Sequence, residues 1–143
     1  MLKLNIGNGT EGTFEFRPSV NRAITDTGTP FIIVPKVDYY AFKEVICKYI
    51  RQSGKNMDCI DTEKSVEFTN CLGVGKDSNL PNVQLYIDQY MYTLPPSFYA
   101  RYSKDISDNC DFLFDYSYTS NNRWIIGPPF LNLFYQVYDM KRN

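Results

Sequence analysis

The chain has 143 residues, of which 43% are hydrophobic and 16% aromatic, and its formal net charge is −1. This length and composition predict one globular domain with a real core, and they exclude a disordered chain and a pair of ordinary domains. No apolar stretch approaches the roughly 18 residues of a membrane span, so we expect no membrane partner. The charge also argues against nucleic acid as a partner, because no basic stripe could neutralise phosphates.

The sequence contains no histidine. Ser-His-Asp and Cys-His nucleophilic mechanisms need an imidazole base, and most zinc sites with an open coordination position use one. We therefore expect neither a metal site nor a cofactor. Any acid–base chemistry would fall to carboxylates, lysines or tyrosines, and carboxylates are the best candidates.

The four cysteines, Cys47, Cys59, Cys71 and Cys110, show none of the C-x-x-C spacing of a zinc or thioredoxin-like site. An even number of cysteines in a small domain suits two disulfides and an oxidising compartment, and four buried thiols are the alternative.

The triplet Asn8-Gly9-Thr10 is a candidate glycosylation sequon, with Asn8 as the acceptor, and it agrees with secretion. Residues 1–5 lack the apolar core of a signal peptide, so any targeting signal would lie upstream of them.

Short strands punctuated by turns dominate the pattern. In chain order the predicted strands are two within residues 1–16, then 23–25, 31–34, 83–87, 90–94, 111–116, 124–126 and 133–138. Asp88-Gln89 forms the turn of a hairpin that Pro95-Pro96 ends. The sequence therefore predicts a mainly β fold of antiparallel sheets.

One helix is predicted after Pro35. Apolar side chains recur there at a spacing of three and four residues, at Phe42, Val45, Ile46, Tyr49 and Ile50. Pro35 suits the first turn, Asp38 complements the helix dipole, and Gly54 lies just past the end. This helix would pack against the sheets.

The residues Asp26-Thr27-Gly28-Thr29 are the best candidate for a catalytic site. Asp26 leaves an apolar strand and enters a turn in which Gly28 lets backbone amides approach the carboxylate. Amide and hydroxyl donors would fix its orientation and favour its charged form. On these four residues alone, a simple turn cap is the more frequent explanation.

The wider sequence resembles the C-terminal lobe of the pepsin-like aspartic proteases. Residues 23–35 are similar to the second active-site loop of that family, and the following helix fits it too. Residues 124–127 resemble its apolar-apolar-Gly segment, and residues 130–139 resemble the strand after it. The resemblance covers nearly the whole chain. We therefore expect residues 1–143 to form one lobe of a bilobal fold.

The resemblance also has implications for the cysteines. Cys71 and Cys110 flank the hairpin that resembles the family's C-lobe hairpin, as the family's disulfide does. Cys47 and Cys59 flank the end of the predicted helix, where a local disulfide would pin the helix to the next loop. With the family, these pairs indicate the secretory pathway, either extracellular, lysosomal or vacuolar.

The family implies aspartic-type endopeptidase chemistry on polypeptide substrates. Two aspartates, one from each lobe, share a proton and act as base and acid on one water. Asp26 would be one of them, and an N-terminal protease lobe would be the partner that supplies the other. The isolated chain would be inactive.

The same resemblance assigns roles to neighbouring residues. Thr27 would make hydrogen bonds between the lobes, Gly28 would offer its amide, and Thr29 would bond the outer carboxylate oxygen. Ile24 and Ile125 would line the substrate cleft, although plain core packing explains these two equally well.

Four departures from the family pattern stand out. The chain has no second D-T-G or D-S-G, Thr25 replaces an apolar residue, and Pro128 stands where an acidic residue or asparagine is common. The chain also stops at Asn143, before the final strand of the family, so we expect a fragment, a processed subunit or a partial product.

Two alternatives remain at this point. The first is a catalytically inactive pepsin-like lobe that acts as a peptide or protein interaction module, which the changes at Thr25 and Pro128 favour. The second is a retroviral-type homodimer in which each copy supplies one D-T-G. That class has shorter lobes and lacks this helix and the cysteine framework.

Overall fold

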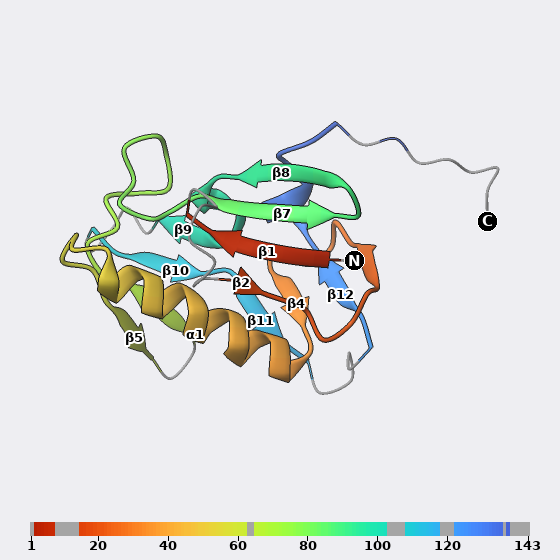
Figure 1. The fold of residues 1–143 in the computed structure, drawn as a ribbon, viewed down its shortest axis with the longest axis horizontal. Helices are drawn as coiled ribbons and strands as arrows, with labels where there is room; N and C mark the ends of the chain where they lie inside the picture. Colours follow the sequence, from red (N-terminus) through yellow and green to blue (C-terminus); the bar gives the residue numbers. More distant parts are fainter. Residues whose placement is uncertain are drawn as a thin grey trace.

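The structure is a computed structural model that describes residues 2–7, 15–62, 65–102, 108–117, 122–135 and 137. Within these residues the chain forms three four-stranded sheets, and helix α1 (Lys36–Gln52) runs along one side of them (Figure 1). The predicted mainly β fold with one packed helix is therefore confirmed. In the described part of the chain, no helix has the length and hydrophobicity needed to cross a membrane. The candidate sequon at Asn8 lies outside the described residues.

The first sheet has the order β2-β1-β7-β8, and all its pairs are antiparallel. Its strands are β1 (Leu2–Ile6), β2 (Glu15–Phe16), β7 (Val83–Ile87) and β8 (Tyr90–Leu94). The hairpin of β7 and β8 has the predicted bounds. Its turn begins at Asp88, whose φ of 54° lies in the left-handed region that aspartate tolerates.

The second sheet has the order β5-β6-β10-β9 and is also antiparallel. Its strands are β5 (Cys59–Asp61), β6 (Val66–Phe68), β9 (Ala100–Tyr102) and β10 (Cys110–Phe112). Three of these strands, β5, β6 and β9, were not predicted. Each has only three residues, too few for an alternating pattern to stand out.

The third sheet has the order β11-β4-β12-β3 and carries the Asp26 loop at its edge. Its strands are β3 (Ala23–Thr25), β4 (Ile32–Val34), β11 (Phe114–Tyr116) and β12 (Trp124–Ile126). Only β12 and β4 are antiparallel, because β12 pairs in parallel with β3 and β11 pairs in parallel with β4. The sequence predicted mainly antiparallel pairing, and this sheet holds the two parallel pairs among the described strands.

Helix α1 follows the predicted pattern closely. Phe42, Ile46 and Ile50 are buried, and the helix packs against β2 and β11. Pro35 occupies the N-cap, and Gly54 follows the C-cap with a φ of 71°. A left-handed glycine after the last turn is a common way to end a helix.

The core is rich in aromatic rings. The Phe42 side chain of α1 packs against the sheets. Its ring centroid lies 4.7 Å from that of Phe114 and 5.9 Å from that of Phe112. Phe68 and Tyr99 are fully buried and meet edge to face at 6.0 Å. Ring pairs at these distances add to the free energy of burial, so one cluster holds helix and sheets together.

The disulfides join the expected cysteines. Cys47 of α1 bonds to Cys59 of β5, and Cys71 bonds to Cys110 of β10. Both predicted pairings are confirmed, and no described cysteine is free.

The predicted strand at residues 133–138 is wrong for the residues that the structure describes. Helix α2 (Pro128–Leu131) ends before these residues, and Leu133 lies in the turn that follows it, donating its amide to the carbonyl of Phe130 at 3.0 Å. Two prolines start this helix, where their fixed φ suits the first turn. Phe130 and Phe134 then fall on one face, with ring centroids 5.0 Å apart.

The predicted strand at residues 111–116 is two strands in the structure. Leu113 separates β10 from β11; its amide donates to the carbonyl of Tyr99 and its carbonyl accepts from the amide of Ile32. The backbone thus bonds to the residue just before β9 on one side and to β4 of the third sheet on the other. A continuous apolar run in the sequence does not reveal such a change of sheet.

Candidate functional site

Asp26 lies directly after β3, at the edge of the third sheet. Its amide donates to the carbonyl of Ile126 in β12 at 3.0 Å, so the pairing of the two strands continues to this residue. At the other end of β3, the amide of Trp124 donates to the carbonyl of Arg22 at 2.8 Å. Backbone bonds to β12 at both ends of β3 therefore fix where the Asp26 loop begins.

The Asp26 carboxylate is held by the turn that follows it. The amide of Gly28 donates to Oδ1 of Asp26 at 2.8 Å. A Cβ at position 28 would lie 3.1 Å from that same oxygen, so glycine makes this close approach comfortable. The loop is exposed from Asp26 to Gly28. One carboxylate oxygen is oriented by the backbone, and in the described residues nothing else bonds the carboxylate.

The other members of the predicted loop make fewer contacts. Within the described residues, the hydroxyls of Thr27 and Thr29 form no hydrogen bond, and Thr29 is half-buried. Their expected roles toward the carboxylate and a second lobe thus stay predictions. Thr25 is exposed in β3, and Pro128 begins α2.

Ile24 and Ile125 lie side by side on one face of the third sheet. They are register partners in the parallel pair of β3 and β12, and Ile125 is also the partner of Ile33 in β4. Because residues directly opposite each other on paired strands point to the same side of a sheet, all three share one face. Ile24 is 41% exposed, and Ile125 and Ile33 are half-buried. The opposite face carries the buried Trp124 and Ile32.

The structure thus brings Asp26, Ile24 and Ile125 together at one edge of one sheet. Asp26 follows Ile24 by two residues, and Ile125 lies across from Ile24. This arrangement is an exposed carboxylate next to an uncovered apolar row. Chemically it offers an oriented acid–base group beside a surface that can accept apolar side chains.

Gly127 lies against the backbone of the loop that follows Asp26. The sequence alone did not assign it a role. A Cβ at this position would lie 2.4 Å from the carbonyl oxygen of Thr29 and 2.6 Å from that of Phe31. Both contacts are to backbone, so a larger residue would have to move the chain itself. The signal in the sequence was a glycine between an apolar strand and two prolines.

Asp38 links the helix to the strand beside Asp26. Its carboxylate is 2% exposed, with Oδ2 accepting from Nε1 of Trp124 at 2.7 Å and Oδ1 accepting from the amide of Ser19 at 2.8 Å. Asp38 lies in the first turn of α1 as predicted, but there it acts as a buried acceptor. It joins α1, β12 and the segment before β3, which together position the loop.

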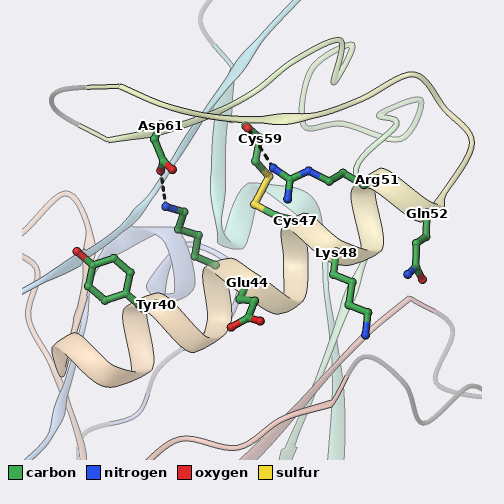
Figure 2. A pocket seen from close by; sticks show the side chains of 9 residues that line it. Tyr40, Glu44, Cys47, Lys48, Arg51, Gln52, Cys59 and Asp61 are labelled. Atoms are coloured by element: carbon green, nitrogen blue, oxygen red, sulfur yellow. Dashed lines mark hydrogen bonds and ion pairs between the residues drawn. A yellow bond between two sulfur atoms is a disulfide. The ribbon is translucent and has the colours of Figure 1, made fainter.

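Several cavities lie outside this site, and two of them border the third sheet or α1. A pocket of about 290 Å³ opens on the inner face of the third sheet, lined by Ala23, Ile32, Trp124 and Ile126 among others. A wider groove of about 550 Å³ lies between α1 and β5 (Figure 2). Asp26 lines neither. In the described residues no cluster of three His, Cys, Asp or Glu side chains could hold a metal ion.

Comparison with known proteins places this geometry in a family. The family model described as eukaryotic aspartyl protease matches residues 2–143. Chymosin of Callithrix jacchus is 28% identical over 123 residues, which cover 85% of this chain and 27% of chymosin. Gastricsin of Homo sapiens is 29% identical over 128 residues, which cover 85% of this chain and 28% of gastricsin. The chain therefore spans less than a third of these relatives. With one lobe of the pepsin-like fold, it belongs to the eukaryotic aspartyl protease family.

Proposed function

We propose that this chain is the C-terminal lobe of an aspartic endopeptidase and that Asp26 is one of its two catalytic aspartates. The observation that carries the proposal is the position of Asp26, at the end of β3, with its Oδ1 held by the Gly28 amide. The family match over residues 2–143 supports it. The chain has one D-T-G motif, so a second lobe would supply the other carboxyl group.

The role of Asp26 follows from acid–base chemistry. Two carboxyl groups that share one water cannot both ionise easily, so the pair holds one proton between them. The ionised member takes a proton from the water as it attacks the peptide carbonyl, and the protonated member donates to that carbonyl. The Gly28 amide fixes Oδ1 of Asp26, which leaves Oδ2 for the shared proton and the water.

The substrate would be a polypeptide that lies across the outward face of the third sheet. Ile24 and Ile125 would contact its apolar side chains, because their shared face is uncovered beside Asp26. Thr27 would face the second lobe, and Thr29 would bond the carboxylate in the assembled enzyme. We further propose a location in the secretory pathway, since two disulfides are typical of proteins in oxidising compartments.

The test is the Asp26→Asn variant, assayed in a complex with a complementary pepsin-like lobe. Asparagine keeps the shape but cannot exchange the shared proton, so peptide cleavage should fall by several orders of magnitude. Asp77→Asn is the matched control, because Asp77 is an exposed loop aspartate far along the chain from the site. It should cleave like the parent complex.

The alternative of an inactive interaction module makes the opposite prediction. If the parent complex binds a peptide but does not cleave it at any pH, and Asp26→Asn leaves that binding unchanged, the lobe is a binding module. If Asp26→Asn cleaves as fast as the parent, Asp26 is a turn cap.

A further inference from the structure

The two disulfides lie in very different surroundings. Cys71 and Cys110 are both fully buried, and Sγ of Cys71 lies 3.3 Å from the carbonyl oxygen of Asp108. Cys59 is instead half-buried, and both Cys47 and Cys59 line the groove between α1 and β5. Only the Cys47–Cys59 bond is therefore within reach of a solute in the folded protein.

The groove beside this bond is large enough for a small molecule. Its volume is about 550 Å³, inside the range of roughly 300–1,000 Å³ that is common for small-molecule sites. Figure 2 shows the disulfide between the helix and the strand above it, with Arg51 on one side and Asp61 on the other. Tyr40 lies at one end of the groove and Gln52 at the other.

The lining of the groove carries both signs of charge. Arg51 bonds Asp58 at 2.7 Å, and Lys43 forms an ion pair with Asp61. Glu44 and Lys48 are exposed on adjacent turns of α1, and among the described residues neither has an ion-pair partner. They leave one anion and one cation without an ion-pair partner in the lining of the groove that Cys47 and Cys59 also line. Such a pair suits a molecule that bears an ammonium group as well as carboxylates.

We propose that the Cys47–Cys59 bond is a thiol–disulfide exchange site for a small zwitterionic thiol bound in this groove. The thiolate attacks Sγ of Cys59, the less buried residue of the pair, forming a mixed disulfide on Cys59 and releasing Cys47 as a thiolate. A second thiol attacks the mixed disulfide, so that two thiols are oxidised to one disulfide and the protein bond takes up two electrons. The inference does not depend on the proposed proteolytic function.

We expect the lobe to stay folded when the Cys47–Cys59 bond opens. Cys47 and Cys59 are 12 residues apart, whereas Cys71 and Cys110 are 39 apart, and the loss of a longer cross-link frees more of the unfolded chain. Strand β5 is also paired with β6, and two ion pairs to α1 hold this segment without the disulfide, one from Asp61 in β5 and one from Asp58 just before it. Exchange would therefore change the covalent state of an exposed edge without unfolding the lobe.

Glutathione is the probe that tests the site, with 2-mercaptoethanol as the uncharged comparison. The native protein is treated with each thiol, alkylated at intervals and mapped by mass spectrometry. Cys47 and Cys59 should be labelled at least about ten times faster than Cys71 and Cys110, since burial blocks attack on the latter pair. A glutathione adduct should appear on Cys59 before any adduct on Cys47, and circular dichroism should not change.

The variant Glu44→Gln/Lys48→Gln separates recognition from simple exposure. The quantity to compare is the exchange rate with glutathione divided by the rate with 2-mercaptoethanol. This ratio should be higher for the parent protein than for an unstructured disulfide peptide. In the variant the ratio should fall to that of the peptide, while the rate with 2-mercaptoethanol stays the same. Lys76→Gln is the control, because Lys76 is an exposed lysine outside the groove. Equal labelling of all four cysteines, labelling only in denaturant, or an unchanged preference in the double variant would overturn the proposal.

Discussion

The indole nitrogen of Trp124 donates a 2.7 Å hydrogen bond to the carboxylate of Asp38, a residue 86 positions earlier in the chain. Both side chains are buried, with exposed fractions of 2%. Asp38 belongs to α1, and Trp124 begins the strand that pairs with β3 just before Asp26. The bond therefore connects α1 to the edge of the third sheet where β3 leads into Asp26.

Asp38→Ala should destabilise the lobe. It leaves the Trp124 indole and the Ser19 amide without their acceptor, so we expect a loss of about 2–4 kcal/mol in the free energy of unfolding. Urea unfolding followed by fluorescence measures this directly, because Trp124 is the single tryptophan. Asp77→Ala, which changes an exposed aspartate, should unfold at the parent urea concentration. An Asp38→Ala midpoint equal to that of Asp77→Ala would contradict the assignment.

Gly127→Ala should disturb the Asp26 loop as well as stability. The added Cβ would lie 2.4 Å from the Thr29 carbonyl oxygen, so the backbone of the loop must shift. Overpacking of this kind typically costs about 1–3 kcal/mol. In an assembled enzyme, cleavage should drop further than the stability loss explains.

Gly75→Ala provides the matched control for Gly127→Ala. Its Cβ would meet nothing within 4 Å, so neither stability nor cleavage should change. If the two alanine variants behave alike, Gly127 does not support the loop.

Much of the fold could be predicted from local patterns. The hairpin of β7 and β8 has clear alternation and a turn at Asp88, and α1 has an unbroken apolar stripe. The three-residue strands β5, β6 and β9 escaped prediction because pairing with neighbours, and not local pattern, makes them strands. A strand was predicted at residues 133–138, but Leu133 lies instead in a turn that follows α2, where the rings of Phe130 and Phe134 are in contact.

The candidate site was predictable in its sequence-local part only. The Asp26 turn and its Gly28 amide follow from adjacent residues. The bond between Asp38 and Trp124 joins residues that are 86 positions apart in the sequence. The lack of space for a side chain at Gly127 arises from the backbone of Thr29 and Phe31, which lies against it. Both become visible only once the strands of the third sheet are in place.

Stability should fall at alkaline pH through Tyr99. Burial raises the pKa of the Tyr99 phenol well above its usual value, and its hydroxyl donates to the carbonyl of Pro81 at 2.7 Å. In the unfolded chain this phenol ionises near about pH 10, whereas the folded protein keeps the proton. Above that pH the unfolded state binds fewer protons than the native state, so the stabilisation is complete below about pH 10 and is lost as pH rises toward the folded pKa.

Tyr99→Phe isolates this contribution from those of the other tyrosines. The variant lacks the buried hydroxyl, so it should be less stable than the parent at neutral pH. The difference should narrow by up to about 1.4 kcal/mol per pH unit above pH 10. Urea titrations at several alkaline pH values measure the gap, and a gap that stays constant would show that Tyr99 does not titrate as we infer.

The last prediction separates cleft from core at Ile24. Ile24 and Ile60 are matched, since each is the middle residue of a three-residue edge strand and their exposed fractions are 41% and 47%. Each side chain is a little more than half buried, so both serine variants should lose a similar amount of stability, on the order of 1–2 kcal/mol. Only Ile24→Ser should change catalysis in an assembled enzyme, with a higher KM for substrates that present apolar side chains, because Ile24 lies beside Ile125 on the face next to Asp26. Steady-state kinetics with apolar and polar peptide series would check this. If Ile60→Ser shifts KM equally, or Ile24→Ser unfolds the lobe without altering KM, then Ile24 serves packing and not substrate binding.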